Sequence, residues 1–134
     1  MSGIYPKETL EMSEMLRKHM FKDWDMESTN GWVQWYVNIG QCYPVASEGK
    51  LVGATFARLV DSEEDCREYY KDTGGEICYV EAAVSRHPMA LASMFDLIWS
   101  GIGKNAKWFA FHRFKKDNAF VKVKMDRAKR NFMR

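Results

Sequence analysis

A single carboxylate interrupts an apolar run in the second half of the chain. Residues 77–84 read ICYVEAAV, with Glu81 in their middle. The run lies between Gly75 and Pro88 and predicts a strand inside a sheet, where an unpaired charge costs roughly several kcal/mol. A carboxyl group in apolar surroundings takes up a proton more readily near neutral pH, which suits a general base. The alternative is that Glu81 faces solvent or pairs with an arginine.

The length and composition indicate one ordinary globular domain, residues 1–134. The chain is 46% hydrophobic and 28% charged, and it is too short for two domains. Its three cysteines are widely spaced and form no CxxC pair, so neither a disulfide framework nor a zinc site is expected. The first residues do not resemble a signal peptide, and no stretch approaches the roughly 20 apolar residues of a membrane span. We therefore expect a soluble, unprocessed protein of the reducing cytoplasm.

The hydrophobic pattern predicts two helices before any strand. Residues 8–22 carry apolar side chains at helical spacing, with glutamates early and basic residues late, as the helix dipole favours. Residues 28–30 (STN) offer an N-cap for a second helix that ends before Gly40. Apolar runs at 41–46 and 51–59, joined by SEGK, predict an antiparallel hairpin.

The rest of the chain predicts a central helix and a closing hairpin around the Glu81 strand. Residues 61–65 are typical of a helix start. A largely apolar segment from Pro88 to Gly101 predicts a buried helix. Residues 107–114 and 119–125 alternate, so that Phe109 and Phe111 share a face with two valines. A short basic helix follows. The fold class is therefore α+β, with about five mostly antiparallel strands around one central helix.

The last quarter of the chain is strongly basic. Residues 1–103 hold 9 basic and 16 acidic side chains, a net charge of −7, whereas residues 104–134 hold 11 basic and 2 acidic, a net charge of +9. Such a segment can bind nucleic acid, a membrane surface or an acidic protein, and it can also dock on the acidic remainder of its own chain. The basic segment by itself identifies no partner.

Four short stretches resemble one known family. They are His19 with Trp24 shortly after it, residues 41–46 (QCYPVA), residues 79–83 (YVEAA) and residues 108–113 (WFAFHR). They are similar to stretches of the RTX toxin-activating lysine acyltransferases, a branch of the GNAT acyltransferase superfamily. The expected order of helices and strands is also similar to that superfamily. The resemblance covers about 100 residues loosely and implies a GNAT-like fold.

The resemblance also implies an activity and two catalytic residues. Members of this branch move a fatty acyl group from acyl carrier protein to an internal lysine of a protein, using a histidine of the first helix and an acid of the central strand. His19 and Glu81 fall at these positions. Toxin activators have aspartate at the second one, which is shorter by one methylene. In the wider superfamily a glutamate on the corresponding strand often acts as a base through water.

The loop before the central helix bears on the acyl donor. Members that use coenzyme A are similar to one another in a glycine-bearing loop there, whereas residues 85–92 (SRHPMALA) contain no glycine, and Pro88 has no N–H to donate. We therefore expect acyl carrier protein rather than coenzyme A as the donor, and no tightly bound cofactor. An acidic carrier protein would contact the basic segment, at Arg113, Lys115, Lys116, Lys122 and Lys124.

Other readings stay open at this point. The chain can be a non-catalytic GNAT-like module that binds nucleic acid or an acidic protein through residues 104–134, with Trp108 and Phe114 available for stacking. A homodimer is compatible with the sequence. His87 is expected to cap a helix, His112 to face outward beside lysines, and Cys78 to be part of the core. No His, Cys or carboxylate spacing suggests a metal site.

Overall fold

The computed structural model describes residues 5–87, 90–113 and 119–132. Its helices and strands follow one another as α1 (Lys7–His19), α2 (Met26–Asn38), β1 (Cys42–Ser47), β2 (Lys50–Val60), α3 (Glu63–Cys66), β3 (Ile77–Ser85), α4 (Ala90–Ser100), the short 3-10 helix η2 (Gly103–Asn105), β4 (Trp108–Arg113), β5 (Ala119–Lys124) and α5 (Met125–Phe132).

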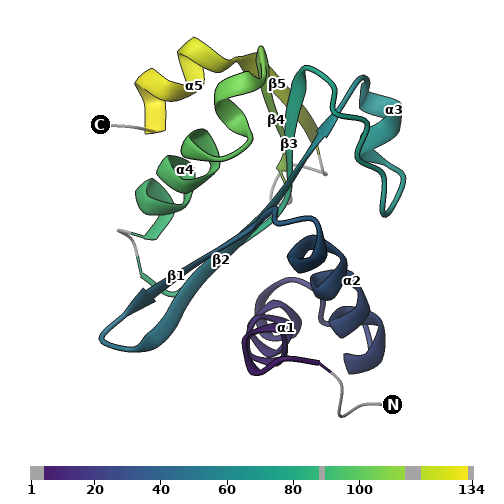
Figure 1. Ribbon diagram of the computed structural model, residues 1–134, viewed down its shortest axis with the longest axis vertical. Helices are drawn as coiled ribbons and strands as arrows, with labels where there is room; N and C mark the ends of the chain where they lie inside the picture. Colours follow the sequence, from purple (N-terminus) through teal and green to yellow (C-terminus); the bar gives the residue numbers. More distant parts are fainter. Residues whose placement is uncertain (1–4, 88–89, 114–118, 133–134) are drawn as a thin grey trace.

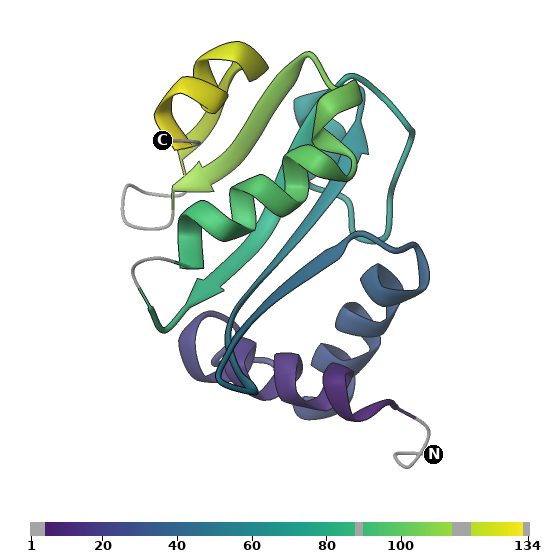
Figure 2. The same ribbon diagram turned by 60° about the vertical axis from the view of Figure 1, so that its left-hand side comes forward.

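One sheet carries the architecture. Its strands lie in the order β1-β2-β3-β4-β5, and only β3 and β4 run parallel to each other. Helices α1 and α2 cover one face of the sheet, and α4 and α5 cover the other (Figure 1). Figure 2 shows α4 lying across the sheet, with the α1–α2 pair at the opposite end of the molecule from α5. The predicted α+β fold with five strands and two N-terminal helices is confirmed.

The N-terminal helices anchor the larger core. Met12, Met15 and Leu16 of α1 and Trp32 of α2 are buried against strands β2 and β3. Helix α2 begins earlier than expected, because the Asp25 carboxylate, rather than residues 28–30, accepts the hydrogen bond from the Ser28 backbone N–H at 2.7 Å. That bond lowers the pKa of Asp25, so the cap is charged at neutral pH and complements the helix dipole.

The predicted hairpins form at the expected places. The turn between β1 and β2 has positive φ at Glu48 and Gly49, as a two-residue hairpin loop requires. In the closing hairpin Phe109 lies opposite Val123, which confirms the shared apolar face. Its predicted turn, residues 115–118, lies outside the described residues.

Helix α4 is buried along one face only. Met94, Phe95 and Ile98 point into the core, whereas Asp96 and Leu97 on the opposite face are exposed. The prediction of a central helix packed on the sheet is confirmed, but its burial does not extend all round. A helix that lies over a single sheet buries one stripe, however apolar its other side is.

Strand β3 contains an extra residue at Glu81. Ala82 pairs with Phe56 and Val80 with Ala57 of β2, so Glu81 has no partner opposite it. This is a β-bulge, which bends a strand and changes the face that its side chains point to. As a result, Glu81 and the neighbouring Ala82 both contact the α1–α2 layer. Glu81 thus keeps the side that alternation from Tyr79 gives it, toward Arg58 and the aromatic side chains of α2, and the bulge adds Ala82 to that side.

Among the residues that the structure describes, no helix is long and apolar enough to cross a membrane.

Two glycines give opposite predictions for stability. A Cβ at Gly75 would overlap the backbone carbonyl oxygen of Val60, whereas a Cβ at Gly31, inside α2, meets only the Tyr5 hydroxyl at 3.9 Å. We expect Gly75→Ala to destabilise the fold and Gly31→Ala to stabilise it by about 0.5–1 kcal/mol, because alanine favours helix interiors over glycine. Urea denaturation measures both. Equal midpoints for the two variants would contradict the described packing around residue 75.

Candidate active site

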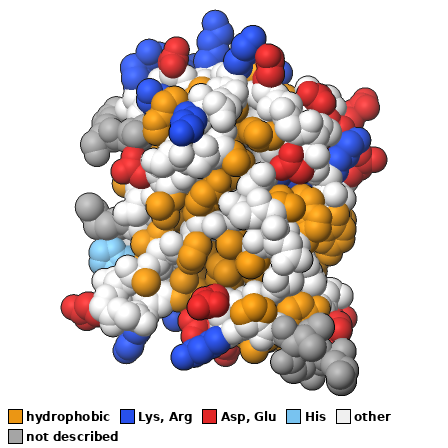
Figure 3. Space-filling model, in the orientation of Figure 1, with side chains coloured by type: hydrophobic (Ala, Val, Ile, Leu, Met, Phe, Trp, Pro, Cys, Tyr) orange, Lys and Arg blue, Asp and Glu red, His pale blue; other side chains and the backbone are white. Residues whose placement is uncertain are grey.

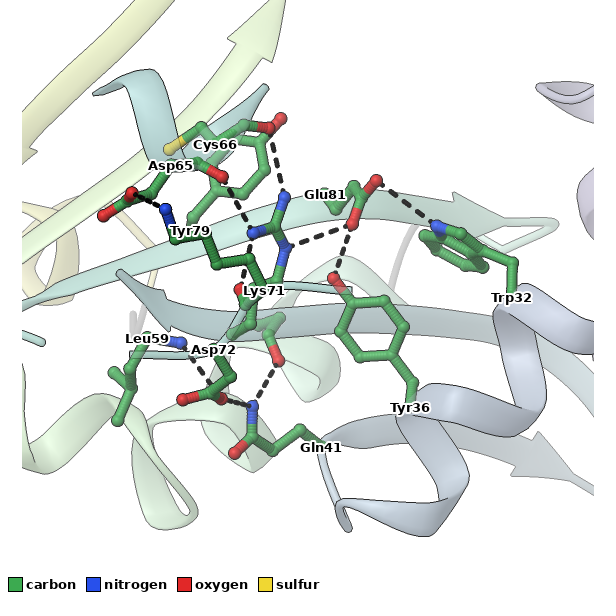
Figure 4. Close-up of polar contacts among 12 residues, drawn as sticks. Trp32, Tyr36, Gln41, Leu59, Asp65, Cys66, Lys71, Asp72, Tyr79 and Glu81 are labelled. Carbon is green, nitrogen blue, oxygen red and sulfur yellow. Dashed lines mark hydrogen bonds and ion pairs between the residues drawn. The ribbon is translucent and has the colours of Figure 1, made fainter. Parts of the chain in front are cut away.

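Glu81 accepts three hydrogen bonds from side chains of other elements. The Tyr36 hydroxyl donates to Oε1 at 2.7 Å, the Arg58 Nε donates to the same oxygen at 3.2 Å, and the Trp32 Nε1 donates to Oε2 at 3.3 Å. Figure 4 shows Tyr36 and Trp32 reaching Glu81 from α2. The sequence left open whether Glu81 faces solvent or pairs with an arginine, and in the structure it pairs with Arg58.

Arg58 is a fully buried cation that connects three segments. Besides Glu81, its guanidinium donates to the backbone carbonyls of Asp65, Cys66 and Lys71, which belong to the segment after β2. Burial disfavours the charged guanidinium, but the contacts with Tyr36 and Glu81 outweigh it and leave the pKa of Arg58 raised. The charge of Glu81 is therefore compensated inside the protein.

The carboxylate keeps one acceptor position. Two carboxylate oxygens offer about four lone-pair positions. Oε1 uses both of its positions on Tyr36 and Arg58, and Oε2 uses one on Trp32. Burial, and then the negative charge of Glu81, raises the pKa of Tyr36 far above its ordinary value, so the phenol stays a donor. Within the described part of the chain, one position on Oε2 therefore has no donor and can accept from a bound molecule, and the Glu81 side chain is 12% exposed.

A cavity of about 360 Å³ lies beside Glu81. Met94, Phe95 and Ile98 of α4 form an apolar part of its lining. Met20, which follows α1, also lines it. Since α4 and α1 lie on opposite faces of the sheet, the cavity passes between strands. The remaining lining residues include Val80, Glu81, Ala82 and Ala83 of β3, and Phe109, Phe111 and His112 of β4.

The cavity occurs where β3 and β4 part. Their parallel pairing extends from Ile77 with Trp108 to Val80 with Phe111 and includes no residue after Val80. Beyond the bulge, β3 therefore has an edge on the β4 side that pairs with no strand among residues 5–87, 90–113 and 119–132. Backbone N–H and C=O groups at such an edge can bind an extended ligand as a further strand would.

His19 lies at the C-terminal end of α1 and is exposed. It is not among the three hydrogen-bond donors to Glu81 in the described part of the chain, and it does not line the cavity. The next residue, Met20, does line it. His19 is thus the sequence neighbour of a residue that lines the cavity, and its catalytic role stays a prediction.

A different histidine shares the cavity with Glu81. His112 lines the cavity and is half-buried, and its Nδ1 lies 2.7 Å from the Tyr79 hydroxyl oxygen. The register confirms that His112 shares a face with Lys122 and Lys124, but the prediction that it faces outward is wrong. Strand alternation alone put it on the same face as Trp108, but the parting of β3 and β4 brings it to the edge of the cavity. Its spacing from Tyr79 in the sequence gave no signal of this contact.

Cys78 is confirmed as a core residue. It is fully buried, and burial raises the pKa of its thiol to about 12, so it is not a nucleophile near neutral pH. No group of three or more His, Cys, Asp or Glu side chains suited to a metal ion occurs within residues 5–87, 90–113 and 119–132.

The loop before α4 uses its own backbone donors. The N–H of Arg86 bonds to the Val52 carbonyl, that of His87 to the Ser85 hydroxyl, and that of Ala90 to the His87 carbonyl. Pro88, which has no N–H to donate, lies outside the described residues. The donors that the structure describes between residues 85 and 90 are thus already engaged.

The basic segment forms an exposed surface at the end of the molecule that carries α5. Lys122 and Lys124 are exposed there, and Lys122 lies over the Trp108 ring at 4.7 Å from its centroid. Arg113 is also exposed, but it pairs with Ala119 at the other end of the β4–β5 hairpin, and strand alternation puts it on the opposite face of the sheet from these two lysines. Lys115 and Lys116 lie outside the described residues. In Figure 3, Lys and Arg side chains gather at this end with acidic ones among them, and apolar side chains form a band across the middle.

Comparisons with known proteins identify the class of fold. No protein-family model and no curated protein matches the chain. Among solved structures, it is similar to an aminoglycoside 6'-N-acetyltransferase complexed with coenzyme A, with a TM-score of 0.59 and 11% identity over 84% of this chain and 58% of that one. It is also similar to the loading GNATL domain of CurA from Lyngbya majuscula, with a TM-score of 0.50 and 13% identity over 81% and 62%.

The protein therefore has the GNAT-like fold that the order of its elements predicted. It spans less than two thirds of either of these two structures. At 11% and 13% identity, the likeness shows the fold alone. It does not show that the protein belongs to the toxin-activating acyltransferases. That part of the resemblance stays a prediction.

The network around Arg58 predicts a large stability effect. We expect Arg58→Met to lower the free energy of unfolding by about 3–5 kcal/mol, because it leaves the carboxylate of Glu81 without its cation in the interior. The double variant Arg58→Met with Glu81→Met should recover part of the loss. Chemical denaturation measures all three proteins.

The matched control is Lys107→Met. It breaks an exposed ion pair with Glu76, whose charged atoms lie 3.1 Å apart, and should cost at most about 1 kcal/mol. If the Arg58 variant were no less stable than this control, the buried ion pair would not support the fold.

Proposed function

We propose that the protein is an N-acyltransferase that moves an acyl group from a thioester to an amine, such as the side chain of a protein lysine. The observation that carries this proposal is the cavity between the parted strands β3 and β4, with Glu81 beside it. Because the cavity is lined from both faces of the sheet, an acyl donor and an amine can enter from opposite faces and meet beside the bulge. Its apolar wall suits an acyl chain.

The reaction requires one bond to form and one to break. The amine nitrogen attacks the thioester carbonyl carbon, the N–C bond forms, the C–S bond breaks, and the proton lost by the amine ends on the leaving thiol. The free acceptor position on Glu81 Oε2 suits an N–H of the incoming amine, directly or through water. His19, one residue before Met20 of the cavity wall, takes up the proton in this proposal.

For the donor we propose acyl carrier protein in preference to coenzyme A. The described N–H groups of the loop before α4 are bound to acceptors of this chain, so they offer little to a pyrophosphate. A donor on a carrier protein brings no pyrophosphate. One of the structural neighbours is complexed with coenzyme A, and both donors are therefore tested.

The carrier protein would dock on the basic surface. Acyl carrier proteins are acidic, and Lys122 and Lys124 offer exposed positive charge on one face of β5. Arg113 is exposed at the other end of the β4–β5 hairpin, so it would contact a different part of the carrier protein. Lys115 and Lys116 belong to the same proposal from the sequence alone.

The rival proposal, a non-catalytic module that binds nucleic acid, has one observation against it. Its candidates for base stacking were Trp108 and Phe114. Lys122 covers one face of the Trp108 ring, and Phe114 lies outside the described residues. Trp99 is likewise covered by Lys129, at 4.0 Å from the ring centroid. A base would have to displace a lysine or use the other face of the ring.

The first test is intact-mass analysis of candidate amines and proteins after incubation with acyl carrier protein or with acyl coenzyme A. We expect a mass increase by one acyl group with the carrier-bound donor. Glu81→Gln and His19→Ala should each lower the rate about 10²–10⁴-fold, since each removes a group that handles the proton.

The control for His19→Ala is Lys18→Ala, an exposed neighbour on the same helix, which should keep the wild-type rate. Thermal unfolding shows whether Glu81→Gln keeps the fold. Full activity in the two test variants would exclude these residues from catalysis, and a wild-type protein inactive with both donors would exclude the proposed function.

The second test concerns the basic surface. The pair Lys122→Glu and Lys124→Glu should raise KM for acyl carrier protein at least about tenfold, because opposite charges on the partners steer association. KM for a pantetheine thioester without the carrier should not change. The control pair, Lys18→Glu with Lys50→Glu, alters the net charge equally on exposed residues elsewhere.

If both pairs behaved alike, docking on the basic surface would be excluded. If instead the protein showed no transfer and the Lys122 and Lys124 pair lost binding to single-stranded DNA, the rival module would be favoured.

A further inference from the structure

His112 occupies a defined position at the end of the β3–β4 pairing. It follows Phe111, the last residue of β4 that pairs with β3, and it lines the same cavity as Glu81. Its ring packs edge-on against Tyr79, with the ring centroids 5.5 Å apart, and it also contacts Phe120 of β5. These contacts restrict the ring orientation.

The Tyr79 hydroxyl determines which ring nitrogen carries the proton. Tyr79 is 4% exposed, and within the described residues its hydroxyl makes one hydrogen bond, to His112 Nδ1 at 2.7 Å. If Nδ1 carried a proton and donated it, the buried phenol proton would have no acceptor, which is unfavourable. Tyr79 therefore donates, Nδ1 accepts, and a neutral His112 carries its proton on Nε2.

The surroundings of the ring favour this neutral form. Burial lowers the pKa of His112, the charge of Arg67 lowers it further, and the charges of Glu63 and Glu81 oppose this in part. Burial also raises the pKa of Tyr79, so the phenol remains protonated and remains the donor. Among the described residues Nε2 has no hydrogen-bond partner. This neutral N–H group thus belongs to a side chain that lines the cavity.

We propose that the Nε2–H of His112, fixed by Tyr79, donates a hydrogen bond to the thioester carbonyl oxygen and stabilises the negative charge that develops there. This rests on the proposed function and adds a residue to it. No proton is transferred from His112: the amine loses its proton as described above, the C–S bond breaks, and the carbonyl forms again. The donor is preorganised in a half-buried position, where such a bond is stronger than in water.

The activity test uses three variants. His112→Ala removes the donor and should lower kcat about 10²–10³-fold with little change in KM, as loss of one oxyanion donor does. His112→Gln keeps a side-chain N–H and should retain more activity than His112→Ala. Tyr79→Phe should lower kcat less than His112→Ala does. It removes the hydrogen bond that fixes the His112 tautomer, but it keeps the imidazole itself.

The second readout does not depend on activity. Nitrogen NMR of the protein labelled at histidine should show His112 as the neutral Nε2–H tautomer at pH 7, and Tyr79→Phe should give a mixture of tautomers. A neutral Nδ1–H tautomer or an imidazolium in the folded wild-type protein would overturn the proposal.

The activity result separates two failures. An active wild-type enzyme with His112→Ala at the wild-type kcat would overturn the role of His112 and leave the acyltransferase proposal standing. A wild-type protein without acyl transfer from either donor would overturn both.

Discussion

The buried ion pair between Arg58 and Glu81 is the interaction on which the rest of the structure depends. A guanidinium without solvent exposure needs acceptors inside the protein, and Arg58 obtains four of them, one from Glu81 of β3 and three from backbone carbonyls of the segment after β2. The same pair compensates the charge that the sequence inserts into an apolar strand. It thereby joins β2, β3 and the loop around α3 through one side chain.

The bulge at Glu81 brings a second residue of β3 to the layer of that ion pair. With regular alternation along β3, neighbouring residues would point to opposite faces of the sheet, but the extra residue directs Glu81 and Ala82 to the same layer. The bulge also coincides with the place where β3 leaves β4. The carboxylate, the bulge and the end of the described β3–β4 pairing thus lie at one place in the sheet.

The two histidines illustrate how a fold selects among candidates. His19 was the candidate that the resemblance favoured, and it lies exposed at the end of a helix. His112 was expected on the outer face, and it lies against the buried Tyr79 at the wall of the cavity. The difference follows from the sheet. His112 comes directly after the last residue of β4 that pairs with β3, and the cavity lies where this pairing ends.

The amino-acid sequence by itself determined the helices and strands, the order in which they occur and the one charged residue inside a core strand. These depend on side-chain periodicity and on turn residues, which act over a few positions. It did not determine the partners of Glu81, which lie 23, 45 and 49 residues away. Only the tertiary structure decided these, because they depend on strand register, and one extra residue in β3 changes the face that every later side chain meets.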